Sequence, residues 1–225
     1  VQGVSETKNT SIAELASQMV GREVFLQVKK DEAKPEEEIL NVEDLWVHDA
    51  RGLLAVKGVS LNIRKGEIVG IAGVEGNGQS ELVEALTGLR KTSQGSINYL
   101  GENIASSTPK NIRRKKIAHI PEDRTNTGLN TQLSIWENLI GNSYFRKPLS
   151  TNGIFNLKKI AQHSNKLKED FDIRAPNISL KVKSLSGGNQ QKVVVARELS
   201  EDPVLTIASQ PTRGVDIGNI EAIHE

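Results

Sequence analysis

The chain has 225 residues, enough for one large domain with a buried core, or for one domain and an appendage. Its 29 Lys and Arg against 28 Asp and Glu give a net charge of +1, which provides no strong field for nucleic acid or anionic lipid. The absence of cysteine excludes a disulfide scaffold and a thiolate metal site. No apolar run reaches the roughly 18 residues of a membrane span. We therefore expect a soluble protein of a reducing compartment.

Residues 1–38 differ in composition from the rest of the chain. Ser11 and Glu14 have the spacing of a capping box before an apolar helical face, and Gly21 is a typical helix stop, so a short helix is predicted. The stretch "REVFLQV" predicts a strand, and "KKDEAKPEEE" holds too little apolar surface to fold. This pattern predicts the tail of a preceding unit followed by a linker.

From Ile39 onward, strands alternate with helices. The stretches "ILNVEDLWV" and "LLAVKGVSLNI" alternate apolar and polar residues as antiparallel strands do. The runs "EIVGIAG", "KIAHI" and "PVLTIA" are short and apolar, as expected of strands buried on both faces. This order predicts an α/β domain over residues 39–225 with a mainly parallel core sheet. Residues of about 129–183 are polar and helix-rich, and we expect them to form an inserted helical subdomain.

The stretch "GVEGNGQS", which begins at Gly73, nearly matches the phosphate-binding pattern G-x-x-x-x-G-K-[ST]. It lies between a predicted strand and a predicted helix, "QSELVEALTGL", and its three glycines permit a curl in which backbone N–H groups converge on an anion. Ser80 stands where a hydroxyl group would contact Mg²⁺, but Gln79 replaces the lysine. The dinucleotide pattern G-x-G-x-x-G fails because its third glycine is absent. Two interpretations stay open, phosphate binding and a tight structural turn.

The stretch "SLSGGNQQKVVVARELS" predicts a helix that opens with Ser186, Gly187 and Gly188. A serine and two glycines before a helix form a second nest of exposed N–H groups that suits an anion. An ordinary capped helix would explain the serine, but not two glycines followed by Asn-Gln-Gln-Lys. An anion site is therefore favoured here.

The stretch "LSGGNQQK" resembles the signature motif of ATP-binding-cassette (ABC) ATPases. The motif order is also that of the family: the loop at Gly73, the signature at Leu185, and then the strand "LTIA" ending in "SQPTRGVD". The variants "GVEGNGQSEL", "HIPEDR" and "QPTRGVD" resemble the second module of fused two-module ATPases that power bacterial importers of simple sugars and nucleosides, with a lean toward the nucleoside branch. The resemblance covers roughly residues 39–225. It implies a P-loop ABC ATPase domain, truncated at its C-terminal end, and makes residues 1–38 the tail of the first module.

The resemblance also implies roles for individual residues, with ATP and Mg²⁺ as the ligands. The cradle for the phosphates would comprise Gly73, Gly76, Asn77, Gly78, Gln79 and Ser80, with Ser80 as a weak metal ligand. The signature would comprise Leu185, Ser186, Gly187, Gly188 and Asn189, and Asp216 would belong to the loop after the strand. The segment Glu122, Asp123 and Arg124 would form a switch beneath the membrane partner.

Four positions depart from the family pattern. Gln79 replaces the phosphate-binding lysine, Ser209 the Mg²⁺-binding aspartate, Gln210 the glutamate that polarises water, and Glu122 the glutamine that senses the γ-phosphate. One charge-assisted contact to phosphate is worth roughly 1.5–3 kcal/mol, about 10- to 150-fold in affinity. Phosphoryl transfer further depends on positioned metal and charge. We therefore expect this module to bind ATP and Mg²⁺ weakly in its own cradle and not to hydrolyse ATP there.

Two other family positions are also in question. The aromatic residue that stacks on adenine should fall near Ala50, where Trp46 is a poor substitute. The switch histidine would lie beyond Glu225, because His224 is too close to the preceding strand. The four histidines lack metal-ligand spacing, and the basic run from Arg113 is predicted to be a solvated helix face.

In ABC ATPases two modules meet head to tail, and each ATP lies between the cradle of one module and the signature of the other. An intact signature beside a degenerate cradle implies that residues 186–188 complete the site of the first module of the same chain. The Gly73 loop would then form the asymmetric second site. The resemblance further implies membrane permease subunits docked on the helical subdomain, a substrate-binding protein acting indirectly, no nucleic acid, and a peripheral location at the cytoplasmic face of the cell membrane.

Alternatives remain for the aromatic residues and for the function. Five of the eight aromatics fall in or near the expected subdomain and form either a small core or a groove for the membrane partner: Trp136, Tyr144, Phe145, Phe155 and Phe171. A soluble ABC factor acting on ribosomes or nucleic acid is a rival function, and the near-neutral charge without basic-aromatic interleaving opposes it. A self-sufficient ATPase is a further rival, opposed by the substitutions at Gln79, Ser209 and Gln210.

Overall fold

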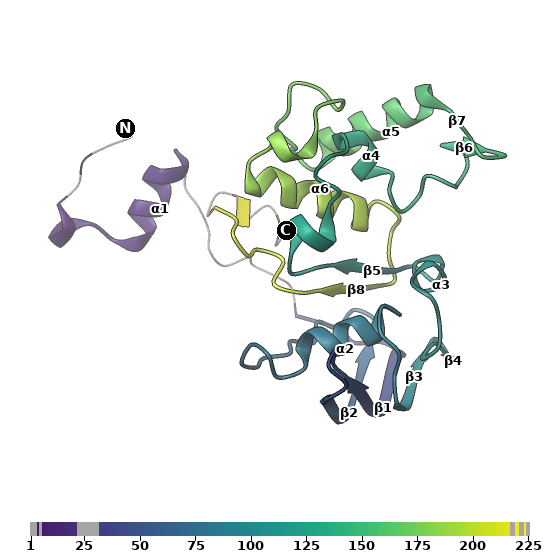
Figure 1. Ribbon diagram of the computed structural model, residues 1–225. Helices are drawn as coiled ribbons and strands as arrows, with labels where there is room; N and C mark the ends of the chain where they lie inside the picture. The colour runs from purple at the N-terminus through teal and green to yellow at the C-terminus, as the bar shows by residue number, and fades with distance from the viewer. Residues whose placement is uncertain (1–3, 5, 22–31, 217–218, 221–222, 224–225) are drawn as a thin grey trace. The chain divides into compact units, whose positions relative to one another are not determined.

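The computed structural model describes residues 4, 6–21, 32–216, 219–220 and 223. The chain divides into two compact units (Figure 1). Unit 1 comprises Val1–Lys30, Ile120–Ser200 and Gln210–Glu225, and unit 2 comprises Asp31–His119 and Glu201–Ser209. No helix in the described ranges is long and apolar enough to cross a membrane.

Unit 2 is built on a four-stranded sheet in the order β2-β1-β3-β4, with each neighbouring pair antiparallel. The predicted antiparallel strands near the start of the domain are thereby confirmed. Val42, Leu45 and Val47 of β1 are fully buried, and a register shift between Val42 and Leu45 brings both onto the buried face although they are three residues apart. The bounds are β1 Glu38–His48, β2 Leu54–Arg64, β3 Gln94–Tyr99 and β4 Glu102–Asn103.

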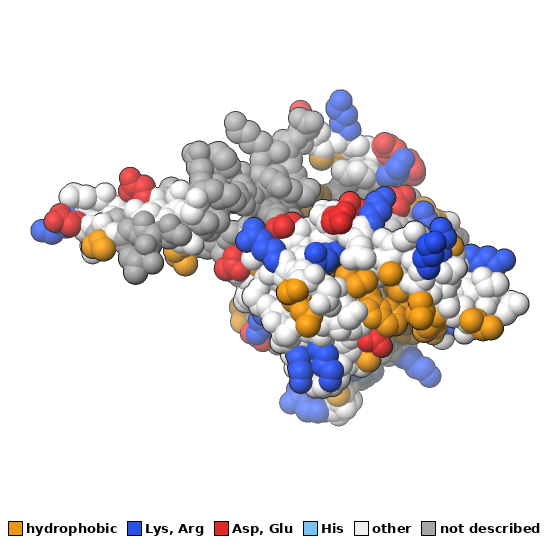
Figure 2. All heavy atoms as spheres, turned by 90° about the horizontal axis from the view of Figure 1, so that it is seen from above, with side chains coloured by type: hydrophobic (Ala, Val, Ile, Leu, Met, Phe, Trp, Pro, Cys, Tyr) orange, Lys and Arg blue, Asp and Glu red, His pale blue; other side chains and the backbone are white. Residues whose placement is uncertain are grey.

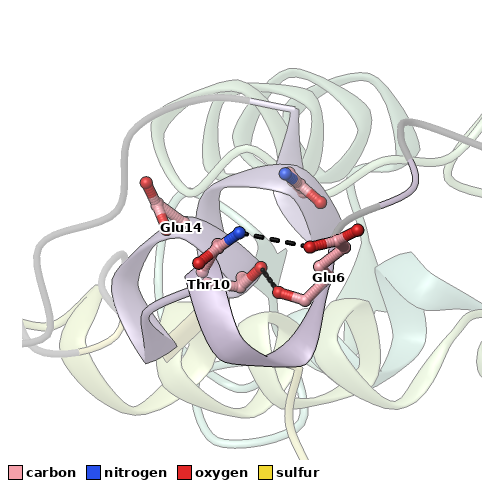
Figure 3. Close-up of a pocket in the computed structure, with 5 residues that line it drawn as sticks. Glu6, Thr10 and Glu14 are labelled. Carbon is pink, nitrogen blue, oxygen red and sulfur yellow. Dashed lines mark hydrogen bonds between the residues drawn. The ribbon is translucent and has the colours of Figure 1, made fainter.

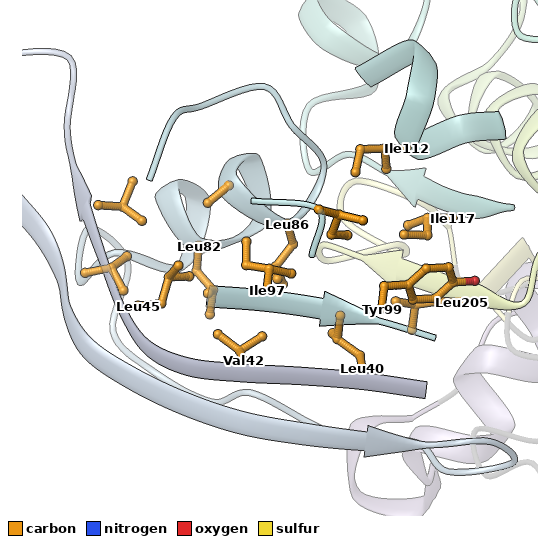
Figure 4. Packing of buried hydrophobic residues seen from close by; sticks show 14 of the residues in the cluster. Leu40, Val42, Leu45, Leu82, Leu86, Ile97, Tyr99, Ile112, Ile117 and Leu205 are labelled. Atoms are coloured by element: carbon orange, nitrogen blue, oxygen red, sulfur yellow. The ribbon is translucent and has the colours of Figure 1, made fainter. Parts of the chain in front are cut away.

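Helix α2 (Gln79–Leu86) covers this sheet, and its buried side chains Leu82 and Leu86 join the core around Val42 and Ile97 (Figure 4). Because these leucines lie four residues apart, they share one helical face. Helix α3 (Pro109–Arg114) is capped by Thr108, whose hydroxyl group accepts from the Asn111 N–H at 3.4 Å. Its last turn carries the start of the predicted basic run.

Strands β5 (Ile117–Ile120) and β8 (Leu205–Ala208) form a separate two-stranded sheet. Ile117 and Leu205 are buried and belong to the core of unit 2. The two strands correspond to the predicted strands "KIAHI" and "PVLTIA". The expectation that "PVLTIA" is buried on both faces is wrong, because β8 alternates between buried and exposed residues.

The predicted buried strand "EIVGIAG" is a further correction. Residues 67–74 form no strand, and Ile68, Ile71 and Val74 are 79%, 57% and 74% exposed. A strand needs neighbours that satisfy its N–H and C=O groups. This run pairs with none of the strands in the described ranges, which is why its apolar composition does not lead to burial.

The start of unit 1 confirms the predicted helix, α1 (Ile12–Val20). The Ser11 hydroxyl group accepts from the Glu14 N–H at 3.2 Å, the Glu14 carboxylate accepts from the Ser11 N–H at 2.8 Å, and Gly21 ends the helix at a φ of 77°. A single 3-10 turn, η1 (Thr7–Asn9), precedes it. The predicted strand "REVFLQV" lies outside the described residues.

The rest of unit 1 is mainly helical and contains the whole of the proposed subdomain of about residues 129–183. Its core is made by apolar faces of three helices, with Ile135, Leu139, Val193 and Val194 fully buried. The helices are α4 Ile135–Leu139, α5 Leu157–Asp170 and α6 Gly187–Leu199; shorter elements are η2 Arg124–Gly128, β6 Ser150–Thr151, β7 Ile154–Phe155 and η3 Val182–Ser184.

Candidate functional site: the signature helix and the Gly73 loop

Helix α6 begins where the sequence predicted, with Ser186 as its N-cap. The Ser186 hydroxyl group accepts from the backbone N–H of Asn189 at 3.4 Å and from its side-chain amide at 3.0 Å. The next two residues are glycines against which side chains of other segments pack closely. A Cβ atom at Gly187 would lie 2.6 Å from Nη2 of Arg124, and one at Gly188 would lie 2.4 Å from the Asn219 side-chain amide and 3.1 Å from the Asp216 carboxylate. The glycines therefore permit a close approach of side chains from two other segments.

The same helix is fastened to the segment at Asp172. The buried Lys192 ammonium group donates to the Asp172 backbone oxygen at 3.0 Å and to its carboxylate at 2.9 Å. That hydrogen bond holds the pKa of Asp172 below its ordinary value of 3.8. One turn earlier, the Asn189 side-chain oxygen accepts from the Arg174 N–H at 2.7 Å. Two polar side chains of α6 thus position its first turns.

The loop after β8 is held by the segment that contains Glu122. The Glu122 carboxylate accepts from the Gln210 side-chain amide at 3.0 Å and forms an ion pair with Arg213. Gln210 itself adopts a left-handed φ of 45°. Helix α6 also contacts this loop, because the Gln191 side-chain amide donates to the Pro211 backbone oxygen at 2.7 Å. Glu122 and Gln210, two of the positions that depart from the family pattern, are therefore bonded to each other.

Unit 1 brings together the signature, Glu122, Gln210 and Asp216 among the predicted site residues. Sequence reasoning missed Arg213, Gln191 and Lys192. The polar run Gln-Gln-Lys after the two glycines was the available signal for the last two, since a helix that buries such residues must provide them with partners. Arg213 carried no signal, because its partner Glu122 lies 91 residues away in the sequence.

The Gly73 loop belongs to unit 2 and is largely exposed. Gly78 is buried at a φ of 96°, and a Cβ atom there would lie 2.5 Å from the Ala55 oxygen, so glycine is required. Gln79 does not point outward from the loop: its amide donates to the Val74 oxygen at 3.0 Å and would collide with a Cβ atom at Gly73. The side chain at the position of the missing lysine thus closes the loop on itself.

The curl of this loop and the start of α2 present backbone N–H groups that fit a phosphate. The metal requirement is poorly met. Ser80 is exposed at the start of α2, and the half-buried Ser209 that follows β8 has no carboxylate. In the described ranges, no group of three or more His, Asp or Glu residues could hold a metal ion. Toward a metal ion, Ser80 and Ser209 would therefore offer hydroxyl oxygens and no carboxylate.

Trp46, the poor substitute for the adenine-stacking residue, is engaged elsewhere. Its indole N–H donates to the Asp44 carboxylate at 2.8 Å. His224 lies outside the described residues. A further pocket, on the segment of η1 and α1, has two carboxylates and no cation among its lining residues, so it does not suit a phosphate group (Figure 3). Its lining residues are Glu6, Asn9, Thr10, Glu14 and Gln18.

Two of the five aromatic residues of the subdomain pack into apolar clusters, and three lie at the surface. Trp136 packs against a small apolar cluster and Phe171 against the core of unit 1. Tyr144, Phe145 and Phe155 instead lie at the surface, 48%, 39% and 46% exposed. The Tyr144 ring meets the other two edge to face, with centroid distances of 5.4 and 6.4 Å. We name these three residues the aromatic cluster.

The fold and the two glycine-rich motifs define the ATP-binding cassette as the class of this protein. Residues 56–213 match the family described as ABC transporter, and the chain belongs to that family. A solved dimeric structure of a bacterial ABC transporter cassette has a TM-score of 0.69 at 25% identity over 82% of this chain and 79% of that chain. The P-loop ABC ATPase fold expected from the sequence is thereby confirmed.

The chain is also similar to several ATP-binding proteins of importers. The chain is 45% identical to the nucleoside import ATP-binding protein NupA of Lactococcus lactis over 94% of this chain and 42% of that protein. It is also 45% identical to the guanosine import ATP-binding protein NupO of Bacillus subtilis, over 98% and 43%. Identity to the xylose import ATP-binding protein XylG of Thermoanaerobacter pseudethanolicus is 36%, over 94% and 42%. The chain thus spans less than half the length of these relatives.

Proposed function

We propose that this chain is the second ATP-binding module of a bacterial importer for nucleosides or simple sugars. Its own ATP site is weak, and its signature helix completes the ATP site of a first module in the same chain. The names of the relatives, nucleoside and sugar import ATP-binding proteins, support the importer class over a soluble factor acting on ribosomes. The chain accounts for 42% and 43% of the length of the two nucleoside relatives, which leaves room for another module.

The contrast between the two glycine motifs carries this proposal. The signature helix has a capped N-terminus and a close-packed approach to Gly187 and Gly188. The cradle has an amide, Gln79, in place of a cation and uses it on its own backbone. The start of α6 suits an anion, while the cradle of the same module lacks its cation. The start of α6 therefore contacts ATP that is bound in the cradle of another module.

In this arrangement the backbone N–H groups at the start of α6 face the γ-phosphate of the ATP in the partner's cradle. The Ser186 hydroxyl group caps the helix and keeps these groups oriented. Asp216 lies beside Gly188 and keeps its loop next to the signature. In the module's own cradle, the backbone curl provides weak binding, and the serine and glutamine at 209 and 210 provide neither metal ligand nor water-polarising carboxylate.

The test compares two substitutions in the complete subunit. Gly187→Asp should abolish ATP hydrolysis and transport, because the side chain collides with Arg124 and its carboxylate repels the phosphate. Gln79→Ala should cost much less, because that position has already lost its cation. Ser106→Asp, at an exposed serine of unit 2, is the control for an added carboxylate. Equal losses for the first two variants, or a larger loss for Gln79→Ala, would refute the division of labour.

Membrane permease subunits are the proposed partners, docked on the helical subdomain, with a substrate-binding protein acting through them. The module would then lie peripherally at the cytoplasmic face of the membrane. The aromatic cluster supports this, together with the neighbouring Ile154 and Leu157, which are 76% and 66% exposed. Hydrophobic side chains gather on the face of the molecule seen in Figure 2. Exposed apolar residues in one patch are typical of interaction sites.

Charge substitutions test the docking surface. Tyr144→Glu and Phe155→Glu should uncouple transport in the complete importer while ATP binding by the subunit remains. Leu100→Glu, at an apolar residue that is 57% exposed in unit 2, is the control. Normal uptake in both cluster variants would leave these aromatics with a packing role alone.

A further inference from the structure

Arg124 lies at the meeting point of three segments of unit 1. Its Nη1 donates to the Arg213 oxygen at 2.7 Å and its Nη2 to the Gly214 oxygen at 3.3 Å. A Cβ atom at Gly187 would lie 2.6 Å from Nη2 and 3.2 Å from the Gly214 oxygen. The guanidinium group therefore fills the space between the loop after β8 and the first residue of the signature helix.

The backbone that carries Arg124 is itself fixed. The Asp123 carboxylate accepts from the backbone N–H groups of Thr125 and Asn126 at 2.9 and 3.0 Å. The Asp123 oxygen accepts from the Gly128 N–H at 3.0 Å, which closes the turn. A side chain that starts from a closed turn has few ways to reach its partners. Its guanidinium position is therefore determined by the turn at one end and by two carbonyl groups at the other.

The geometry uses the shape of arginine as well as its charge. Two N–H groups, held in one plane on separate nitrogens, reach two consecutive carbonyl oxygens, and the donors of a lysine ammonium group, which share one nitrogen, do not have that fixed spacing. The Nε atom is buried and makes no hydrogen bond. Burial of such a group without a partner is unfavourable. It is retained here together with a tight contact to a glycine, a combination expected where position matters more than stability.

We propose that Arg124 is a positioning residue for ATP hydrolysis at the partner's site. It holds the start of the signature helix at a set position against the loop of Arg213 and Gly214. This inference rests on the proposed function, since only a signature that faces a nucleotide needs such precision. Arg124 does not touch the nucleotide in this proposal. It acts through Gly187 and Gly214, so its loss affects the rate of hydrolysis rather than the binding of ATP.

The experiment measures kcat and KM for ATP hydrolysis and the thermal midpoint of the complete subunit assembled with its permease. Arg124→Gln and Arg124→Lys are compared with Arg64→Gln, a control at an exposed arginine of β2 in unit 2. Both Arg124 variants should lower kcat about tenfold or more, because small displacements of positioning groups are costly. KM and the thermal midpoint should stay near those of the parent and of the control.

Three results would overturn the proposal: kcat near the parental value in Arg124→Gln, full rescue by Arg124→Lys, or loss of kcat in step with a fallen thermal midpoint. The second would show that charge alone suffices, and the third that the role is in folding. Gly187→Asp in the same assay separates this inference from the function on which it rests. If that variant is inactive while Arg124→Gln is active, only the positioning role fails; if both are active, the signature assignment fails as well.

Discussion

The signature helix and the Gly73 loop are both glycine-rich starts of a helix, yet they are supported in different ways. At the signature, side chains from distant segments, Arg124 and Asp216, pack against the two glycines. At the Gly73 loop, the side chain closest to Gly73 is that of Gln79 from the same loop, and Gly78 packs on the backbone of Ala55. Similar local sequences thus lead to a motif contacted by polar side chains of distant segments in one case and to a motif whose own side chain bonds its backbone in the other.

The largest effect is expected from restoring the cation of the loop. Gln79→Lys should tighten nucleotide binding by this chain about 10- to 150-fold, because one charge-assisted phosphate contact is regained. Titration with a fluorescent ATP analogue measures the change. Gln132→Lys, at an exposed glutamine of unit 1, adds the same charge elsewhere. An equal gain in that control would show that the loop is no phosphate cradle.

The same variant should remain unable to turn over ATP, since the residues at 209 and 210 still lack carboxylates. The parent chain should likewise show no turnover above background. Steady phosphate release that is abolished by Gly78→Asp would contradict this expectation, because it would assign the activity to this loop.

A smaller effect is expected where α6 is anchored. Asp172→Asn should lower the free energy of unfolding by about 1–2 kcal/mol, since the buried Lys192 ammonium group loses a charged partner that is itself mostly exposed. Asparagine tolerates the left-handed φ of 45° at this residue, so the change tests the charge and not the backbone. Urea unfolding measures it, with Asp202→Asn at a 99% exposed side chain as the control. Equal losses in the two variants would remove the anchoring role.

The stabilising effect of Asp172 should depend on pH in a defined direction. Its pKa is lower in the folded protein than the ordinary 3.8, because Lys192 stabilises the ionised form. The contribution is therefore fully present above pH 3.8 and is lost as the pH falls through the folded pKa. Urea unfolding of the parent and of Asp172→Asn at a series of pH values should show the two stabilities converging in acid. A difference that grows as the pH falls would contradict the assigned cause.

The smallest effect is expected at Glu122. Its ion pair with Arg213 is partly solvated, with the two side chains 25% and 53% exposed, so Glu122→Gln should cost less than about 1 kcal/mol of unfolding free energy. The bond from the Gln210 amide survives, because glutamine retains an acceptor oxygen. A loss well above that figure in urea unfolding would show that the loop after β8 depends on this charge.

Local sequence patterns predicted the elements whose causes are local. The capping box at Ser11, the two antiparallel strands β1 and β2, and the helix opening at Ser186 all depend on patterns of neighbouring residues, and the structure confirms each. The run "EIVGIAG" failed because burial of a strand depends on partners that its own residues do not specify. For the same reason, the sequence did not decide whether the aromatic residues form a small core or a surface groove, since the exposure of a side chain depends on packing.

The sequence by itself determined the motif order and the absence of the lysine and the carboxylates, because these depend on residue identity and close spacing. Only the tertiary structure decided that Gln79 turns back on the Val74 oxygen, that Glu122 bonds to Gln210, and that Arg124 packs against Gly187. The residues of these two pairs, Glu122 with Gln210 and Arg124 with Gly187, are separated by 88 and 63 positions in the sequence. Contacts of that range are set by how the core packs and not by any local preference of the chain.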